Sequence, residues 1–157
     1  MNKHIFTKRI LTHVAKAIRG NERPFNKERL IEEITSDCFS DQAERDLWRP
    51  VVEQRIDLLL AEEGALFSHI KDACRLCDTK HRRCDHVCPT NAITHTGEGV
   101  VIDWDKCIEC GLCVDGCIAG AIVARSDFAR VAYLLMQSDE QPVYAILAPA
   151  FVGQFGE

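Results

Sequence analysis

Eight of the nine cysteines lie in one short segment between positions 74 and 117. The first group has the spacing Cys-x2-Cys-x6-Cys-x3-Cys and comprises Cys74, Cys77, Cys84 and Cys88. The second group has the spacing Cys-x2-Cys-x2-Cys-x3-Cys and comprises Cys107, Cys110, Cys113 and Cys117. Thiolates at such spacing are ligands for zinc and for iron–sulfur clusters. Because the cytosol keeps thiols reduced, nine cysteines in an intracellular chain indicate metal or redox chemistry instead of disulfides.

An internal repeat relates the two cysteine groups. The sequence CPTNAI at Cys88–Ile93 is echoed by CIAGAI at Cys117–Ile122, and each echo closes one group. Two similar halves within one segment predict a pseudo-two-fold unit, in which each half contributes the same elements in the same order.

The spacing predicts two 4Fe-4S clusters with exchanged ligands. A cubane cluster needs four thiolates at the corners of a tetrahedron, and a tight Cys-x2-Cys-x2-Cys loop supplies only three of them without strain. In two-cluster ferredoxins the fourth cysteine of each run ligates the other cluster. We therefore assign the first cluster to Cys74, Cys77, Cys84 and Cys117. The second cluster is assigned to Cys107, Cys110, Cys113 and Cys88.

Structural zinc is the alternative for these cysteines. Cys74-x2-Cys77 with Cys84-x3-Cys88 has a spacing that closes one four-thiolate zinc site by itself. The second group resists this interpretation, since three cysteines at successive x2 spacing and a fourth at x3 crowd a single tetrahedral ion. With eight cysteine ligands available, two histidines near the first group, His81 and His86, are not needed as ligands. The ninth cysteine, Cys38, is expected to be a small buried, apolar side chain.

The stretch CPTNAI followed by VVIDWDKCIECGLC resembles bacterial two-cluster ferredoxins. The resemblance implies a ferredoxin-like fold and transfer of single electrons. The chain departs from the usual pattern at two places, because six residues separate Cys77 from Cys84 where the usual run has two, and no proline follows Cys117. The inserted residues include Lys80, Arg82 and Arg83, which we interpret either as a docking loop for an acidic electron partner or as a solvated loop.

Residues 1–70 contain no metal-ligand pattern and are predicted to be helical. Apolar residues recur on one face of the first helix, which Gly20 is expected to end. A second helix is predicted to begin after Asn26 as its N-cap, and a third to span residues 41–63 with a kink or a restart at Pro50. Short polar turns between these helices predict a small bundle, and its histidines His4, His13 and His69 are expected to be surface or core residues.

Beyond the cysteines, residues 126–137 are predicted to form a helix, and the continuous apolar run Val143–Ala148 is typical of a strand buried within a sheet. This order, with LAPA directly after the strand, resembles the start of the catalytic domain in iron-only (FeFe) hydrogenases and their non-hydrogenase relatives. In that family the ferredoxin segment supplies electrons to an H-cluster held by further cysteine motifs, and no cysteine follows Cys117. Without its sheet, the segment 143–157 is expected to be mobile or to pair with another molecule.

The composition is that of an ordinary globular protein, with 46% apolar and 27% charged residues and a net charge of −5. The negative charge disfavours nucleic acids and anionic membranes as partners. No apolar stretch is long enough for a membrane span, and the basic N-terminal segment lacks a signal-peptide core. We expect a cytoplasmic protein whose partner is a redox protein or a fused catalytic domain.

These patterns predict an α+β chain with a helical domain over residues 1–70, a ferredoxin-like domain with two 4Fe-4S clusters over residues 71–125, and the truncated start of an α/β domain over residues 126–157. The predicted function is electron transfer as the accessory module of an iron-only hydrogenase-like protein. No catalytic residue is predicted, so enzymatic activity would belong to the parent protein. A redox sensor that reshapes the helical domain, and a structural zinc module, are the alternative functions.

Overall fold

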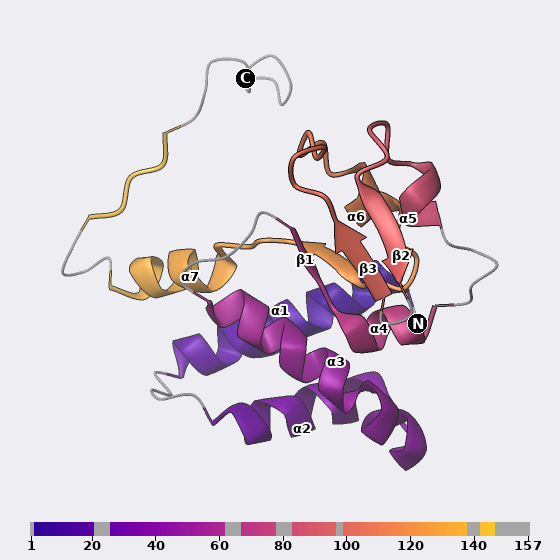
Figure 1. Ribbon diagram of the computed structural model, residues 1–157. Helices are drawn as coiled ribbons and strands as arrows, with labels where there is room; N and C mark the ends of the chain where they lie inside the picture. The colour runs from indigo at the N-terminus through magenta and orange to yellow at the C-terminus, as the bar shows by residue number, and fades with distance from the viewer. Residues whose placement is uncertain are drawn as a thin grey trace.

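The computed structural model describes residues 2–20, 26–61, 67–77, 83–96, 99–137 and 142–146. The elements in chain order are α1 (Lys3–Arg19), α2 (Lys27–Cys38), α3 (Gln42–Leu60), β1 (Phe67–His69), α4 (Lys71–Arg75), α5 (Arg83–His86), β2 (Ile93–Thr96), β3 (Gly99–Ile102), α6 (Leu112–Gly116), β4 (Ile122–Ala124) and α7 (Phe128–Met136). Figure 1 shows α1 and α3 between α2 and the strands, with α5 and α6 beside the strands. The described chain is therefore α+β, with a helical region followed by small sheets.

Side-chain caps fix where the N-terminal helices begin. The Asn26 carboxamide oxygen accepts a hydrogen bond from the Arg29 backbone N–H at 3.0 Å, so α2 begins where the sequence predicts. Asp41 caps α3 in the same way, accepting from the Glu44 N–H at 3.1 Å. Helix α3 runs through Pro50 without a restart and ends at Leu60, while the predicted end at residue 63 lies outside the described residues.

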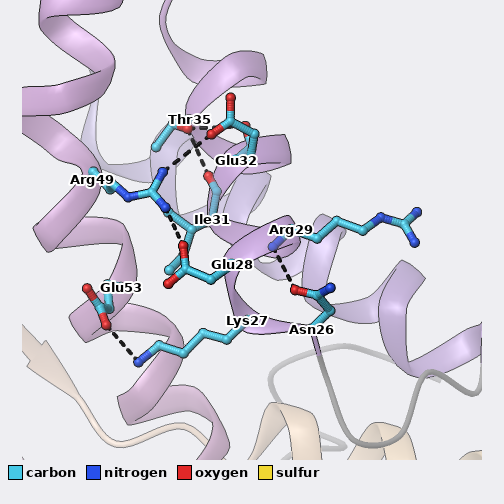
Figure 2. A network of polar contacts seen from close by, with 9 residues as sticks. All are labelled: Asn26, Lys27, Glu28, Arg29, Ile31, Glu32, Thr35, Arg49 and Glu53. Atoms are coloured by element: carbon cyan, nitrogen blue, oxygen red, sulfur yellow. Dashed lines mark hydrogen bonds and ion pairs between the residues drawn. The ribbon is translucent and has the colours of Figure 1, made fainter.

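Helices α2 and α3 are joined by an apolar face with ion pairs at its edge. Figure 2 shows Arg49 of α3 reaching Glu28 and Glu32 of α2, and Lys27 Nζ lies 3.0 Å from Glu53 Oε1. Exposed pairs of this kind contribute about 0–1 kcal/mol each, whereas a fully buried aliphatic side chain contributes about 1.5–3 kcal/mol. The apolar face therefore dominates, and its most buried residues are Ile31, Ile34, Val51, Val52 and Ile56.

The strands form two antiparallel pairs, β1 with β4 and β2 with β3. Their registers place Ser68 opposite Val123 and Thr94 opposite Val101. Strand β1 lies within the stretch that the sequence predicts to be helical. Three residues are too few for an alternating pattern to stand out, so this strand escapes detection from the sequence.

The C-terminal part of the described chain continues the helical region. Helix α7 falls within the predicted residues 126–137, and it contacts α1 and α3 with Ala129 buried between them. Residues 142–146 form no strand, and Tyr144 and Ile146 are 83% and 97% exposed. The predicted strand over 143–148 is therefore not formed in its described part, since residues 142–146 pair with no other strand of the described residues; residues 147–157 lie outside the described residues. Within the described residues, no helix has the length and apolar content that a membrane span requires.

Candidate metal centre

The two cysteine groups sit on two copies of one backbone pattern. In the first half the backbone N–H of Cys74 donates to Ile70 O at 3.1 Å, and in the second half that of Cys107 donates to Asp103 O at 3.0 Å. Both anchoring residues are themselves tied to the opposite half, since Ile70 N–H donates to Ala121 O and Asp103 N–H to Ala92 O, each at 2.8 Å. The halves therefore repeat the same hydrogen bonds in the same order.

The strand pairing interleaves the two halves. Strand β1, at the start of the first half, pairs with β4 at the end of the second, and β2, at the end of the first half, pairs with β3 at the start of the second. Each strand that follows a fourth cysteine is thus held by the opposite half. This pairing places the turns that begin at Cys88 and Cys117 beside the start of the opposite half.

Each fourth cysteine begins a turn in which the backbone bonds its sulfur. The Ala92 N–H donates to Cys88 Sγ at 3.3 Å, and the Ala121 N–H donates to Cys117 Sγ at 3.1 Å. The preceding residues, Asn91 and Gly120, have φ of 52° and 63°. This left-handed conformation turns the next N–H back toward the sulfur, and asparagine and glycine are the residues that adopt it most readily.

One cavity brings together four of the predicted ligands. Cys88 from the first half lines it with Cys107, Cys110 and Cys113 from the second, which is the set assigned to the second cluster. The remaining wall is largely apolar and includes Phe67, Ala92, Ile93, Ile102, Ile108 and Leu112. Four thiols, an apolar wall and an N–H directed at a sulfur suit a 4Fe-4S cluster, so the residues present fit this group.

The thiol environments in this cavity differ from one another. Burial raises the pKa of Cys113, and the negative charges of Cys107 and Cys110 add to the effect. Burial also works against the Cys88 thiolate, but hydrogen bonds from the Thr90 hydroxyl and from backbone N–H groups outweigh it and lower the pKa of Cys88. Cys110 is exposed. The centre therefore has one open edge.

The structure describes the cysteines of the first group but not residues 78–82 between Cys77 and Cys84. Burial, followed by the charges of Cys117 and Asp85, raises the pKa of Cys84 to about 11. The turn that begins at Cys117 lies beside the start of this group, since the Ala121 carbonyl accepts from the Ile70 N–H and the Ile70 carbonyl accepts from the Cys74 N–H. Cys74 and Cys77 are half-buried. The insertion residues Lys80, His81 and Arg82 lie outside the described residues, while Arg83 begins α5 and is exposed.

His95 is a neighbour of the first group that sequence reasoning missed. Its Nε2 lies 3.3 Å from Cys84 Sγ and 3.9 Å from Asp85 Oδ2, and these three side chains form a set able to hold a metal ion. The alternation of side chains along β2 could have predicted that His95 points inward, because His95 shares the inward face with Ile93 while Thr94 is exposed. His86, by contrast, is exposed at the end of α5.

The remaining cysteine and two histidines named in the sequence analysis lie outside the two cysteine groups. Cys38 ends α2, where it is half-buried; burial raises its pKa above the ordinary value and the nearby Arg9 opposes the effect. His13 lies beside Glu33 and Asp37 on the helical region. His69 of β1 is half-buried, and burial lowers its pKa.

Comparison with known proteins identifies part of the chain. Residues 100–123, which contain the second cysteine group, match the family model of a 4Fe-4S binding domain. Over 76 residues the chain is 34% identical to a selenate reductase subunit from Mesobacillus selenatarsenatis, an alignment that covers 48% of this chain and 24% of the relative. Over 49 residues it is 47% identical to a tetrathionate reductase subunit from Archaeoglobus fulgidus, an alignment that covers 31% of this chain and 23% of the relative.

The matched segments thus span about a quarter of the length of these curated relatives. No solved structure matches the chain significantly. Both relatives are named as reductase subunits and neither as a hydrogenase, so the hydrogenase resemblance of the tail stays a prediction.

Proposed function

We propose, on the premise of a 4Fe-4S binding domain at residues 100–123, that this chain passes single electrons through two 4Fe-4S clusters. The observation that carries the proposal is the cavity in which Cys88 of the first half joins Cys107, Cys110 and Cys113 of the second. A fourth sulfur supplied by the opposite half is what exchanged ligation in a two-cluster ferredoxin requires.

The eight cysteines divide into two ligand sets in this proposal. One set comprises Cys74, Cys77, Cys84 and Cys117, and the other comprises Cys107, Cys110, Cys113 and Cys88. Each bound cluster supplies a one-electron redox couple. The chain binds it through the thiolates, directs the N–H groups of Ala92 and Ala121 at two ligand sulfurs, and excludes water with apolar side chains. Hydrogen bonds to sulfur and limited exposure both tune the reduction potential.

Electrons are proposed to enter or leave at the open edge of the second half. Cys110 is exposed there, and its neighbours Ile108 and Leu112 are 62% and 47% exposed. Apolar side chains beside an exposed ligand allow a protein partner to approach the cluster closely without leaving a buried charge unpaired. The basic residues of the insertion, Lys80, Arg82 and Arg83, are a second proposed contact for an acidic partner.

The reductase subunits that the chain resembles favour a place in a multi-subunit reductase, in which this chain carries electrons for a catalytic partner protein. Delivery to a fused hydrogenase-like domain is the narrower possibility, and it rests on the sequence of residues 143–157 alone. A cytoplasmic location, where thiols are kept reduced for cluster assembly, is part of the proposal. Cell fractionation with an antibody against the chain tests that location.

Metal determination on the anaerobically purified chain tests the central proposal. We expect about eight iron and about eight acid-labile sulfide per chain, with a brown colour that bleaches on reduction and a paramagnetic signal in the reduced state. Zinc without sulfide would instead support a structural metal site.

Two substitutions serve as matched controls for the metal determination. Cys38→Ser is expected to leave the iron content unchanged, because both ligand sets are complete without it. His95→Gln is expected to do the same, since four cysteines complete the first set although His95 Nε2 lies 3.3 Å from Cys84 Sγ. Loss of about half of the iron in His95→Gln would make this histidine a ligand and would contradict the assignment of the first cluster.

A further inference from the structure

Arg55 is a buried cation between the helical region and the cysteine turns. It lies on α3 and is 7% exposed. Its Nη1 donates to Thr7 Oγ1 of α1 at 2.8 Å, and its Nη2 donates to Gly120 O at 2.6 Å. The guanidinium carbon lies 5.2 Å from the centre of the Phe6 ring. Three segments of the chain therefore meet at this one side chain.

The charge of Arg55 has no carboxylate partner among the described residues. Both hydrogen-bond acceptors, a hydroxyl and a carbonyl, are neutral, and the buried Nε has no acceptor in that part of the chain. Burial lowers the pKa of the guanidinium, yet arginine stays protonated in proteins. A buried and unpaired charge destabilises the folded state. A negative group close to Arg55 would remove this destabilisation.

The negative group that the structure places nearby is Cys117. The Gly120 carbonyl that accepts from Arg55 belongs to the turn in which Gly120 N–H donates to Cys117 O at 3.2 Å and Ala121 N–H donates to Cys117 Sγ at 3.1 Å. Two effects act on the pKa of Arg55. Burial, the larger effect, lowers this pKa, and the negative charge of a Cys117 thiolate raises it. Cys117 is itself buried, so the attraction between the two groups is weakly screened.

We propose that Arg55 is the buried counter-charge of the cluster that Cys117 helps to hold, and that it raises the reduction potential of that cluster. The proposal rests on the proposed function, since it requires the cluster. Four thiolates give a 4Fe-4S cluster a net negative charge, and reduction adds one electron to it. A fixed cation beside the cluster in a region of low dielectric constant stabilises the reduced state more than the oxidised state.

Arg55 also distinguishes the two otherwise similar halves. The position equivalent to Gly120 in the first half is Asn91, which is exposed to solvent. Gly120 is buried, and an added Cβ there would lie 2.7 Å from Arg55 Nη2, so the glycine makes room for the guanidinium. Arg55 thereby acts more strongly on the cluster of Cys117 than on the other cluster and sets the two potentials apart.

Potentiometric titration of the loaded full-length chain, followed by electron paramagnetic resonance, tests this role. In Arg55→Gln, which keeps polar atoms but removes the charge, we expect one potential to fall by at least 59 mV, equivalent to tenfold in the one-electron equilibrium. The cluster that shifts should be the one lost in Cys84→Ser. Arg55→Lys, which keeps the charge, and Arg49→Gln, at an exposed ion pair on the same helix, should leave both potentials nearly unchanged.

Every outcome of this series bears on the role of Arg55. Unchanged potentials, or equal shifts of both clusters, in a fully loaded Arg55→Gln chain would overturn it. If Arg55→Gln does not take up iron while Arg55→Lys does, the charge is needed for assembly and the role is supported. If Arg55→Lys also fails to take up iron, the guanidinium is needed for its shape and the role is wrong. A wild-type chain without iron and sulfide would overturn the proposed function together with this inference, whereas unchanged potentials leave the proposed function intact.

Discussion

At the scale of the residue, the fourth cysteine of each half lies in a turn that packs against the other half. Cys88 lines the cavity of the second group, and the turn that begins at Cys117 is hydrogen-bonded to Ile70 at the start of the first group. Both fourth cysteines accept a hydrogen bond from the backbone N–H four residues ahead. Such bonds stabilise a thiolate, which is the form that binds iron. Each fourth cysteine thus has its sulfur hydrogen-bonded within its own turn, which suits the ligand role proposed for it.

Serine substitutions test this exchange of ligands. We expect Cys117→Ser and Cys84→Ser to lose the same cluster, and Cys88→Ser and Cys113→Ser to lose the other, because each pair belongs to one ligand set. The paramagnetic signals of the four reduced variants identify the cluster that remains, and iron determination should show a loss of about four iron per chain. If Cys117→Ser instead matched Cys113→Ser, each half would keep its own cysteines and the exchanged assignment would be wrong.

At the scale of the element, two short turns with left-handed residues hold the cysteine halves together. The turns end at Asn91 and Gly120, and a strand begins two residues after each of them. Both turns place an N–H beside a cysteine sulfur and then lead into a strand held by the opposite half. The two positions nevertheless differ, because Asn91 is exposed and Gly120 packs against Arg55.

Gly120→Ala is expected to destabilise the protein. At φ +63° a side chain is strained by about 1–2 kcal/mol, and the new Cβ would lie 2.7 Å from Arg55 Nη2. We expect the thermal unfolding midpoint of the loaded protein, followed by circular dichroism, to fall by roughly 2–8 °C. Asn91→Gly is the matched control at the equivalent turn, where glycine accepts the same φ and little change is expected. Equal stability of Gly120→Ala and wild type would show that the turn adapts.

At the scale of the whole molecule, the helical region and the cysteine region are joined by polar contacts around a shared core. Lys3 Nζ donates to Val114 O and Asp115 O at the end of α6, and Gln54 Nε2 donates to Asp72 Oδ2 of α4 at 2.5 Å. One continuous set of buried side chains includes residues of both regions, such as Ile10, Ile56 and Ile122. The helices therefore support the cysteine turns directly, and Arg55 is one of these supports.

Apolar side chains also remain exposed toward the C-terminal end of the described chain. On α7 they include Val131, Leu134, Leu135 and Met136, and beyond it Val143, Tyr144 and Ile146. We expect deletion of residues 143–157 to leave the iron content unchanged, because no proposed ligand lies beyond Cys117, and to lower any self-association of the chain. Iron determination and analytical ultracentrifugation measure the two effects. Loss of iron on deletion would place the tail within the cysteine region and would shift the proposed domain boundary at residue 126.

The helix ends and the cysteine spacing follow from local sequence. Asn26 and Asp41 are caps whose side chains bond N–H groups within the same helical turn, so no distant contact is needed to recognise them. The repeat that ends in Cys88 and Cys117 likewise shows in the sequence, because equal turns need similar residues at the same spacing. Strand β1 does not show, since three residues carry too little pattern and their pairing partner lies more than fifty positions away.

The sequence by itself determined the type of chemistry, because eight thiols in two repeated groups already select a 4Fe-4S binding domain, and residues 100–123 match one. Tertiary structure alone decided which charges surround those thiols. His95 is eleven positions from Cys84 and Arg55 is sixty-two from Cys117, and neither separation has a periodic signature. Electrostatic effects act through space and strengthen as water is excluded, so the residues that set a potential become visible only when distant segments pack together.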